Sequence, residues 1–393
     1  MYLPAFLQTS PSLGRRRARG VVGVIRLLGL WVCLVARALA EPPAPPPCIP
    51  LIYCTDLFHP YDDPDDHFDL ATVFALPEFD IRCVILDQGD EQLKRPGHGA
   101  VAQLNRMTGR NVPAFGGLGA KLHAPHDPGL DQAEPFQAGV AAILDTLRRA
   151  TNPVTIITVG SVRDLVAAFN REPELFRRKV GCVLAFIGEA SQADFREWNV
   201  ALDPHAYVGL MRSGLPLYWV PCFDGGAWQN AGHASFWRGK HDDLLHAASP
   251  QLLQYFIYAL EKESAEPCGF LTQPVDDVRR ARLLAGTRNL WCTAVFSALA
   301  GRDLVCEDRR YVAKPRPSGR AANPSLRNEL FEFEPVTVRI TDAAVVTYGP
   351  APEARRIRRF TVRDPVNYAR GMTEVTAGLL LPLGQMRPPP TRR

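Results

Sequence analysis

The chain has 393 residues, of which 46% are hydrophobic and 22% are charged. This composition excludes a disordered or fibrous protein and provides enough apolar material for a large buried core. The first forty residues carry six arginines and no acid, so the formal net charge of +4 becomes −2 without them, and the basicity gives no reason to expect a nucleic acid as partner.

The first forty residues have the pattern of an export signal. Four arginines over 15–19 precede a mostly apolar stretch at 21–35, and Ala38-Leu39-Ala40 is a small-residue cleavage signature. Arg26 and Arg37 leave an apolar run shorter than the ~20 residues that a transmembrane span needs. We therefore expect cleavage after Ala40, a secreted or periplasmic protein, and no stable membrane insertion after cleavage.

A Pro-rich linker over 41–48 leads into a predicted α/β domain over 49–302. Short β-branched runs predict strands at 49–54, 81–86, 154–159, 180–187 and 217–222. Amphipathic patterns predict helices at 69–76, 99–108, 138–149, 162–170, 204–212, 252–260, 276–284 and 290–299. This alternation indicates a mainly parallel, Rossmann-like sheet flanked by helices, with ligands bound at the carboxyl ends of its strands.

The later part of the chain has a different pattern. Residues 303–386 are predicted to form a β-rich C-terminal appendage, with strand patterns at 337–340 and 344–348, and residues 387–393 a disordered tail. The eight cysteines beyond the export signal lack zinc spacing. Export would allow one or two disulfides, for example among Cys48, Cys268 and Cys306, but the spacing does not give their connectivity.

An acidic segment between the first predicted strand and the first helix carries the strongest chemical signal. Six aspartates lie within the fourteen residues 56–69. A loop at this place lies at the ligand-binding edge of the sheet, where clustered carboxylates repel one another unless a hard cation such as Ca²⁺ neutralises them. The alternative is a solvated acidic turn that caps the helix, although a cap needs one aspartate. Phe68 stands where an EF-hand needs glycine, which excludes that motif.

This segment and three later ones resemble the inosine/uridine-preferring nucleoside hydrolases. That family opens with a strand, the pattern DxDxGxDD and a helix. Here Cys54-Thr55-Asp56 resembles the DxD, with Cys54 in place of the first acid, and Asp65-Asp66 resembles the closing DD after an insertion of about five residues. The stretch 153–165 resembles the strand–Gly–turn–helix of the family, residues 195–204 resemble its EFN…DP motif, and 214–221 resembles the strand that follows.

The resemblance implies a Ca²⁺-dependent hydrolase that cleaves the N-glycosidic bond of a nucleoside or related riboside, its small-molecule partner. Asp56 would be the general base. The implied metal ligands are Asp56, Asp66 and the main-chain carbonyl of Val159, and the implied sugar-binding residues are Asp65, Glu197, Asn199 and Asp90. Asp90 stands where the family usually has a ribose-binding Asn, and an ordinary loop acid is the other interpretation. Asp203 is expected to cap a helix.

One departure affects the metal site. The family supplies a further calcium carboxylate from a late His-Asp-Pro, whereas Trp291 stands in that Asp position here. His241-Asp242-Asp243 is interpreted as an exposed helix start. The metal is then bound by the inserted acids Asp62 or Asp63, bound more weakly, or absent.

The departures leave a second interpretation open, a secreted non-catalytic protein that binds a sugar or nucleoside on the same fold. His233, His241 and Trp228 are candidates for activating the leaving group, and nothing in the sequence selects one. The oligomeric state is also left open, a homo-oligomer included.

Overall fold

The structure, a computed structural model, describes residues 48–192, 194–316, 325–352 and 356–385. The predicted export signal, nearly all of the predicted linker and the predicted disordered tail lie outside these residues. Within the described ranges, no helix has both the length and the apolar character needed to cross a membrane. No disulfide joins the cysteines of these ranges, so the suggested bridges are not found among them.

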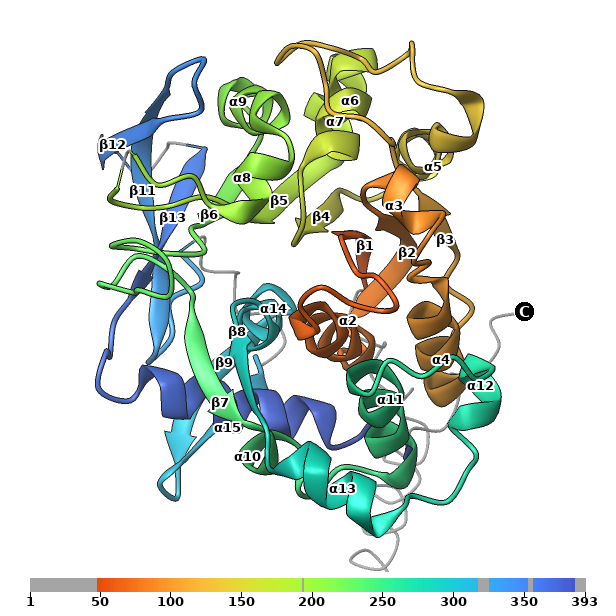
Figure 1. Ribbon diagram of the computed structural model, residues 1–393. Helices are drawn as coiled ribbons and strands as arrows, with labels where there is room; N and C mark the ends of the chain where they lie inside the picture. Colours follow the sequence, from red (N-terminus) through yellow and green to blue (C-terminus); the bar gives the residue numbers. More distant parts are fainter. Residues whose placement is uncertain (1–47, 193, 317–324, 353–355, 386–393) are drawn as a thin grey trace, which may run out of the picture. The chain divides into compact units, whose positions relative to one another are not determined.

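A nine-stranded sheet forms the centre of the protein (Figure 1). Its strand order is β12-β11-β13-β6-β5-β4-β1-β2-β3. The bounds are β1 (Ile49–Thr55), β2 (Phe79–Leu86), β3 (Ala114–Gly116), β4 (Val154–Thr158), β5 (Val180–Phe186), β6 (Leu217–Val220), β11 (Phe331–Ile340), β12 (Val346–Pro350) and β13 (Ile357–Val362). The first six of these strands pair in parallel, which confirms the predicted sheet.

The β-rich C-terminal strands extend this central sheet. Strand β13 pairs in parallel with β6, and β11 and β12 follow in antiparallel order. Two separate two-stranded antiparallel sheets pair β7 (Trp237–Lys240) with β8 (Thr287–Leu290) and β9 (Arg302–Glu307) with β10 (Arg310–Pro315). The helix predicted at 290–299 begins at Thr293 instead, and Leu290 belongs to β8, whose pairing with β7 holds it extended.

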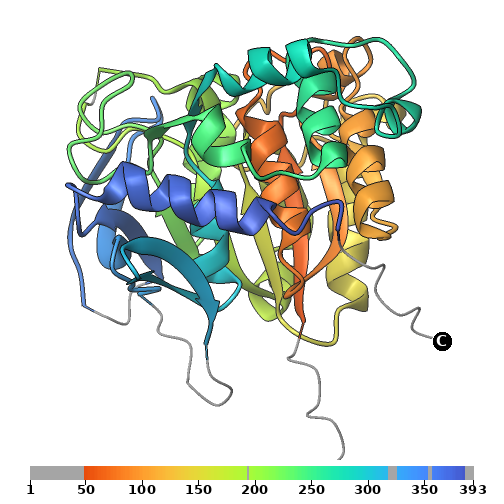
Figure 2. The same ribbon diagram turned by 90° about the horizontal axis from the view of Figure 1, so that it is seen from below.

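Helices cover both faces of the sheet. One face is covered by α2 (Asp65–Ala75), α4 (His98–Thr108), α11 (Pro250–Leu260), α14 (Thr293–Leu299) and α15 (Tyr368–Leu380), and Figure 2 shows α15 running across it. The other is covered by α5 (Ala138–Arg149), α6 (Arg163–Arg171), α7 (Pro173–Lys179) and α9 (Pro204–Arg212). The remaining helices are α3 (Gly89–Gln92), a 3₁₀ turn (Glu134–Phe136), α8 (Trp198–Leu202), α10 (His241–Leu245), α12 (Pro267–Phe270) and α13 (Asp277–Leu284).

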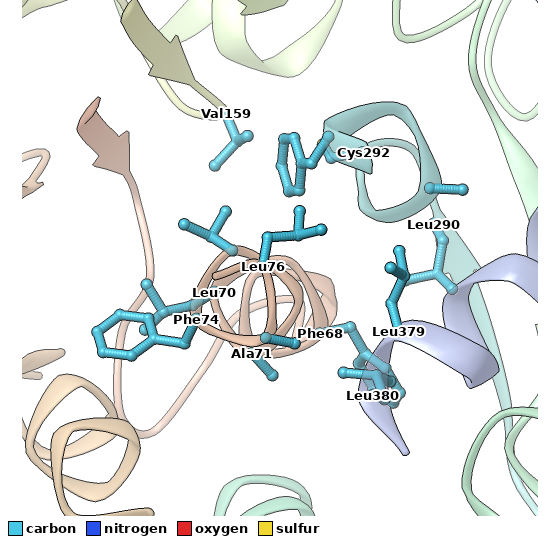
Figure 3. Close-up of a cluster of buried hydrophobic side chains, with 14 of the residues drawn as sticks. Phe68, Leu70, Ala71, Phe74, Leu76, Val159, Leu290, Cys292, Leu379 and Leu380 are labelled. Atoms are coloured by element: carbon cyan, nitrogen blue, oxygen red, sulfur yellow. The ribbon is translucent and has the colours of Figure 1, made fainter. Parts of the chain in front are cut away.

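Helix α2 lies in the middle of the larger apolar cluster (Figure 3). All of its residues from Asp66 to Ala75 are buried, with Phe68 and Phe74 packed in the same cluster as Leu380 of α15. The helix begins four residues before the predicted start, at Asp65, and its first turn is acidic. An acidic first turn is favoured there by the helix dipole. Burial of α2 therefore fixes two carboxylates at the carboxyl edge of the sheet.

Candidate active site

A cavity of about 420 Å³ opens at the carboxyl ends of the central strands. Its lining comes from the loop between β1 and α2, the residues after β4, the loop between β5 and α8, the residues after β6, and the segment before α14. The structure brings six of the seven sequence-predicted site residues to this lining: Asp56, Asp65, Asp66, Val159, Glu197 and Asn199.

Asp56 follows directly on β1, in a row of three strand ends. The register pairs Thr55 with Leu86 of β2 and Cys54 with Thr158 of β4, so Asp87, Asp56 and Gly160 lie next to one another along the sheet edge. A Cβ atom placed on Gly160 would lie only 2.9 Å from Oδ1 of Asp56. A glycine is therefore required at position 160 for the carboxylate of Asp56 to lie where it does.

The carboxylates of the cavity raise one another's pKa. Burial raises the pKa of Asp56 well above its ordinary value, and the negative charges of Asp87, Glu197 and Asp62 raise it further. Burial and the charges of Asp56 and Asp65 likewise raise the pKa of Asp66, although its Oδ1 accepts a hydrogen bond of 2.6 Å from Oγ1 of Thr55. A cation placed among these groups would relieve the repulsion that raises these pKa values.

The inserted acids, Asp62 and Asp63, form ion pairs with arginines. Asp62 is largely exposed and pairs through both oxygens with the guanidinium of Arg95, with 2.9 Å between Oδ2 and Nη2. Asp63 pairs with Arg288 at 3.3 Å. Within the described ranges, neither Asp56 nor Asp66 forms an ion pair with a basic side chain. The two inserted acids therefore stabilise the rim of the cavity, and the unpaired carboxylates lie deeper.

The donor atoms of the cavity fit a hard divalent cation. Asp56, Asp66 and the main-chain oxygen of Val159 supply carboxylate and carbonyl oxygens, the ligands that Ca²⁺ and Mg²⁺ prefer. Trp291 also lines the cavity, where a further acid would complete the set, and its Nε1 donates to the carbonyl of Cys222 at 2.9 Å. The protein therefore offers fewer ligands than a closed site requires, which leaves coordination positions for water or substrate oxygens.

A compact group of metal-ligating side chains lies outside the cavity. In the described part of the chain, only His123, Asp127 and Asp131 bring three such ligand atoms within 4.8 Å of one another. His123 and Asp131 are exposed and pair at 3.1 Å, and the Asp127 carboxylate accepts hydrogen bonds from two main-chain amides. These contacts account for the group without a metal ion.

Glu197 and Asn199 hold the loop that they belong to. The carboxylate of Glu197 caps α8 and accepts hydrogen bonds from the amides of Gly188 and Asn199, both at 2.8 Å. Burial raises the pKa of Glu197 to about 7 against these hydrogen bonds, which lower it. The side-chain amide of Asn199 donates to the main-chain oxygens of Val159 and Phe186. Both side chains are thus fixed before any ligand arrives.

Aromatic side chains form the opposite wall of the cavity. The ring of Phe223 lies 5.9 Å from Phe195, 5.5 Å from Trp228 and 5.8 Å from Trp291, measured between centroids. Trp228 remains 55% exposed, so part of its ring is available to a ligand. Phe223 belongs to no motif of the sequence, but it directly follows the predicted strand at 217–222, where ligand-facing residues are expected.

The remaining sequence candidates lie outside the cavity lining. Asp90 is exposed in α3, and Gln88, which has a left-handed φ of 58°, lines the cavity in its place. Asp203 accepts a hydrogen bond from the amide of Ala206 and caps α9, as expected. Of the three candidates for leaving-group activation, only Trp228 lines the cavity.

The segment His241-Asp242-Asp243 forms the start of α10. Both of its acids are exposed, as expected, but His241 is buried, because it packs against Phe68 and bonds through Nδ1 to the carbonyl of Leu283. This histidine therefore belongs to the packing between α2 and α10.

Sequence comparison places the chain among nucleoside hydrolases. The profile of the inosine-uridine preferring nucleoside hydrolase family matches residues 60–267, a region that begins just after Asp56. An uncharacterised protein of Schizosaccharomyces pombe is 26% identical over 180 residues, which cover 40% of this chain and 57% of that protein. The pyrimidine-specific ribonucleoside hydrolase RihA of Citrobacter koseri is 24% identical over 189 residues, covering 43% of this chain and 58% of RihA.

The fold is also found in a solved nucleoside hydrolase. A plant nucleoside hydrolase superposes with a TM-score of 0.52 at 16% identity, over 86% of this chain and 98% of that one, which shows a shared fold. The matched region spans a little under three fifths of the length of these curated relatives. The family profile covers more than half of the chain. The protein therefore belongs to the inosine-uridine preferring nucleoside hydrolase family.

Proposed function

We propose that this protein hydrolyses the N-glycosidic bond of a nucleoside or a related riboside, with Ca²⁺ as its metal ion. The observation that carries the proposal is the convergence, in one cavity, of buried unpaired carboxylates, a fixed Glu197–Asn199 pair and an exposed aromatic ring. Acid–base groups, hydroxyl-binding groups and a stacking surface are the three elements that cleavage of a nucleoside requires.

Asp56 is the group that accepts a proton from the attacking water. Its carboxylate lines the cavity beside Asp66, and no basic side chain of the described residues pairs with it and weakens it as a base. When bound, a divalent cation would supply Lewis acidity and a fixed point for oxygen ligands beside Asp56 and Asp66. The carbonyl of Val159 completes the set of protein oxygens on that side.

Asp65, Glu197 and Asn199 hold the sugar. In the described ranges no group donates to Oδ1 of Asn199, which leaves this oxygen to accept a hydrogen bond from a sugar hydroxyl. Since the loop is already fixed by hydrogen bonds, binding costs little side-chain entropy. Groups held in this way stabilise positive charge as it develops on the sugar ring.

Trp228 and the neighbouring rings bind the leaving group. A flat heterocycle stacks on such a surface, and the contact does not depend on which base is present. Protonation of the leaving base is assigned to no residue of this chain.

A binding protein without turnover is the second candidate. Trp291, in place of a further acid, favours it, because this substitution weakens the metal site. The two candidates are separated by incubating the purified chain with a panel of purine and pyrimidine nucleosides, with Ca²⁺ or with a chelator. Release of reducing sugar that depends on Ca²⁺ supports hydrolysis, and binding without release supports the second candidate.

We further propose that the protein is exported and cleaved after Ala40. The Arg-rich start, the apolar run and Ala38-Leu39-Ala40 support this proposal. Intact-mass analysis of protein recovered from outside the cytoplasm should give a chain that begins at Glu41. A cytoplasmic product that begins near Met1 would contradict it.

A further inference from the structure

We propose that Asp87 is a positioning residue that holds the turn after β4, and through this turn keeps the carboxylate of Asp56 and the carbonyl of Val159 directed into the cavity. The inference rests on the proposed function and extends it to a residue at the end of β2. Asp87 is buried, with 1% of its surface exposed, and does not line the cavity. It therefore acts through its neighbours rather than on a substrate.

Four hydrogen bonds fix Asp87 itself. Its amide donates to the carbonyl of Thr55 at 2.8 Å, and its carbonyl accepts from Nε2 of Gln92 at 3.2 Å. Its carboxylate accepts at both oxygens, from the amide of Gln88 at 2.7 Å and from the amide of Ser161 at 2.8 Å. A carboxylate with both oxygens engaged and a tethered main chain has one orientation.

The bond to Ser161 transmits this orientation to the site. Ser161 follows Gly160, whose Cα lies so close to Asp56 that a Cβ would stand 2.9 Å from Oδ1 and 3.0 Å from Cγ of that residue. Val159, on the other side of Gly160, is itself held by a bond of 3.0 Å from its amide to the carbonyl of Cys54. A shift of the turn would therefore displace the backbone against which the carboxylate of Asp56 packs, and it would rotate the carbonyl of Val159.

Only an acid satisfies both amides at position 87. Asparagine has the same shape but offers one acceptor oxygen, so its NH₂ group would face one of the two N–H groups. A negative charge on Asp87, which lies beside Asp56, is partly balanced by Arg163, whose guanidinium is buried and bonded to Asp203 at 3.0 Å. Near the same edge β1 carries Cys54, which has no carboxylate to offer. The carboxylate that binds this turn comes from Asp87, at the end of β2.

The test compares Asp87→Asn with Asp164→Asn. Asp164 is also a buried acid, and its Oδ1 accepts a hydrogen bond of 2.9 Å from the amide of Leu118, a contact that asparagine retains. Among the described residues, Asp164 forms no hydrogen bond with the turn at 159–161. Both variants lose one buried carboxyl group, so both report the general cost to stability. Hydrogen exchange of the Ser161 and Leu118 amides, kcat, KM and thermal midpoint are measured for each full-length variant.

Asp87→Asn should speed exchange at Ser161 by about tenfold, the loss of one hydrogen bond, and lower kcat by roughly 10²-fold with a smaller change in KM. Asp164→Asn should leave Ser161 exchange and kcat within about twofold of wild type. Equal effects of the two variants on kcat, or unchanged exchange at Ser161 in Asp87→Asn, would overturn the proposal. If the wild type cleaves no nucleoside, the proposed function fails, and exchange at Ser161 still decides whether Asp87 holds the turn.

Discussion

The side-chain amide of Asn199 donates a hydrogen bond of 3.3 Å to the main-chain oxygen of Val159. The same nitrogen donates to the oxygen of Phe186 at 3.1 Å, so one side chain joins the ends of β4 and β5. Asn199 is expected to bind the sugar, and the carbonyl of Val159 is expected to bind the cation. The contact between them makes the two halves of the site a single unit.

Replacing Asn199 with alanine should therefore weaken both nucleoside and Ca²⁺ binding, because the carbonyl of Val159 loses the donor that orients it. We expect a loss of about tenfold or more in each affinity by calorimetry. Asn170→Ala is the matched control, since the amide of Asn170 also donates to two main-chain oxygens, of Pro125 and Asp127, and none of these residues lines the cavity. Unchanged Ca²⁺ affinity in Asn199→Ala would show that the sugar-binding and the metal-binding residues act independently, contrary to this expectation.

The metal site can be located by two aspartate substitutions in the same loop. Asp66→Ala should abolish Ca²⁺ binding in calorimetry, because it removes a buried carboxylate that has no basic partner among the described residues. Asp62→Ala should leave the affinity within a few-fold, because Asp62 is exposed and paired with Arg95. The reverse result would assign the cation to the insertion at the rim.

The carboxylate cluster also predicts how stability depends on pH. Burial, opposed by hydrogen bonds, raises the pKa of both Glu197 and Asp69 to about 7, and burial and repulsion raise that of Asp66. A raised carboxyl pKa means that the folded state holds more protons, so these carboxyls lower the stability of the cation-free protein as pH rises from about 4, their ordinary value, to about 7. His67, whose pKa burial lowers to about 3, acts in the opposite sense up to about pH 6.5, so the contribution of the cluster is isolated by comparing variants over about pH 5–7.

Thermal unfolding with a chelator should show a larger loss of midpoint between about pH 5 and pH 7 in the wild type than in Asp66→Asn, because that variant lacks one of the clustered charges. Ca²⁺ should raise the wild-type midpoint more at the higher pH, where fewer protons compete with it. Equal changes of the midpoint with pH in the chelated wild type and in Asp66→Asn would contradict a role for the clustered charges.

The aromatic wall predicts a specific effect on the leaving group. Trp228→Ala should weaken nucleoside binding by roughly 1–3 kcal/mol, the range measured when a ring that stacks on a base is removed. Trp228→Phe should retain much of the affinity. A methyl riboside, whose aglycone cannot stack, should bind both variants as it binds the wild type. Equal losses for the methyl riboside and the nucleoside would place Trp228 beside the sugar.

Much of the fold could be predicted because its strands are buried on both faces. Continuous apolar runs such as 49–54 and 180–187 then stand out between helical patterns. The attachment of β13 to β6 could not be predicted, because pairing between distant strands leaves no local signal. The short strand β8 was missed for the same reason, and its Leu290 was assigned to the helix that begins at Thr293.

The candidate site was predictable where a motif keeps its spacing, as with Asp65-Asp66 and Glu197-Trp198-Asn199. Asp90 was misplaced because a left-handed Gln88 turns the chain into α3 and carries Asp90 to the surface. The signal for Asp87 was present, an acid at the carboxyl end of a predicted strand. Its role depends on a partner in another loop, the amide of Ser161, which sequence spacing does not reveal.

Whether Asp56 acts as the base in hydrolysis is tested by measuring kcat of Asp56→Asn alongside the nucleoside affinity and bound metal of this variant. We expect kcat to fall by roughly 10²-fold or more, the usual scale for a lost acid–base group, while affinity changes far less as long as the metal content matches the wild type. A variant with wild-type kcat and a full complement of metal would contradict the assignment.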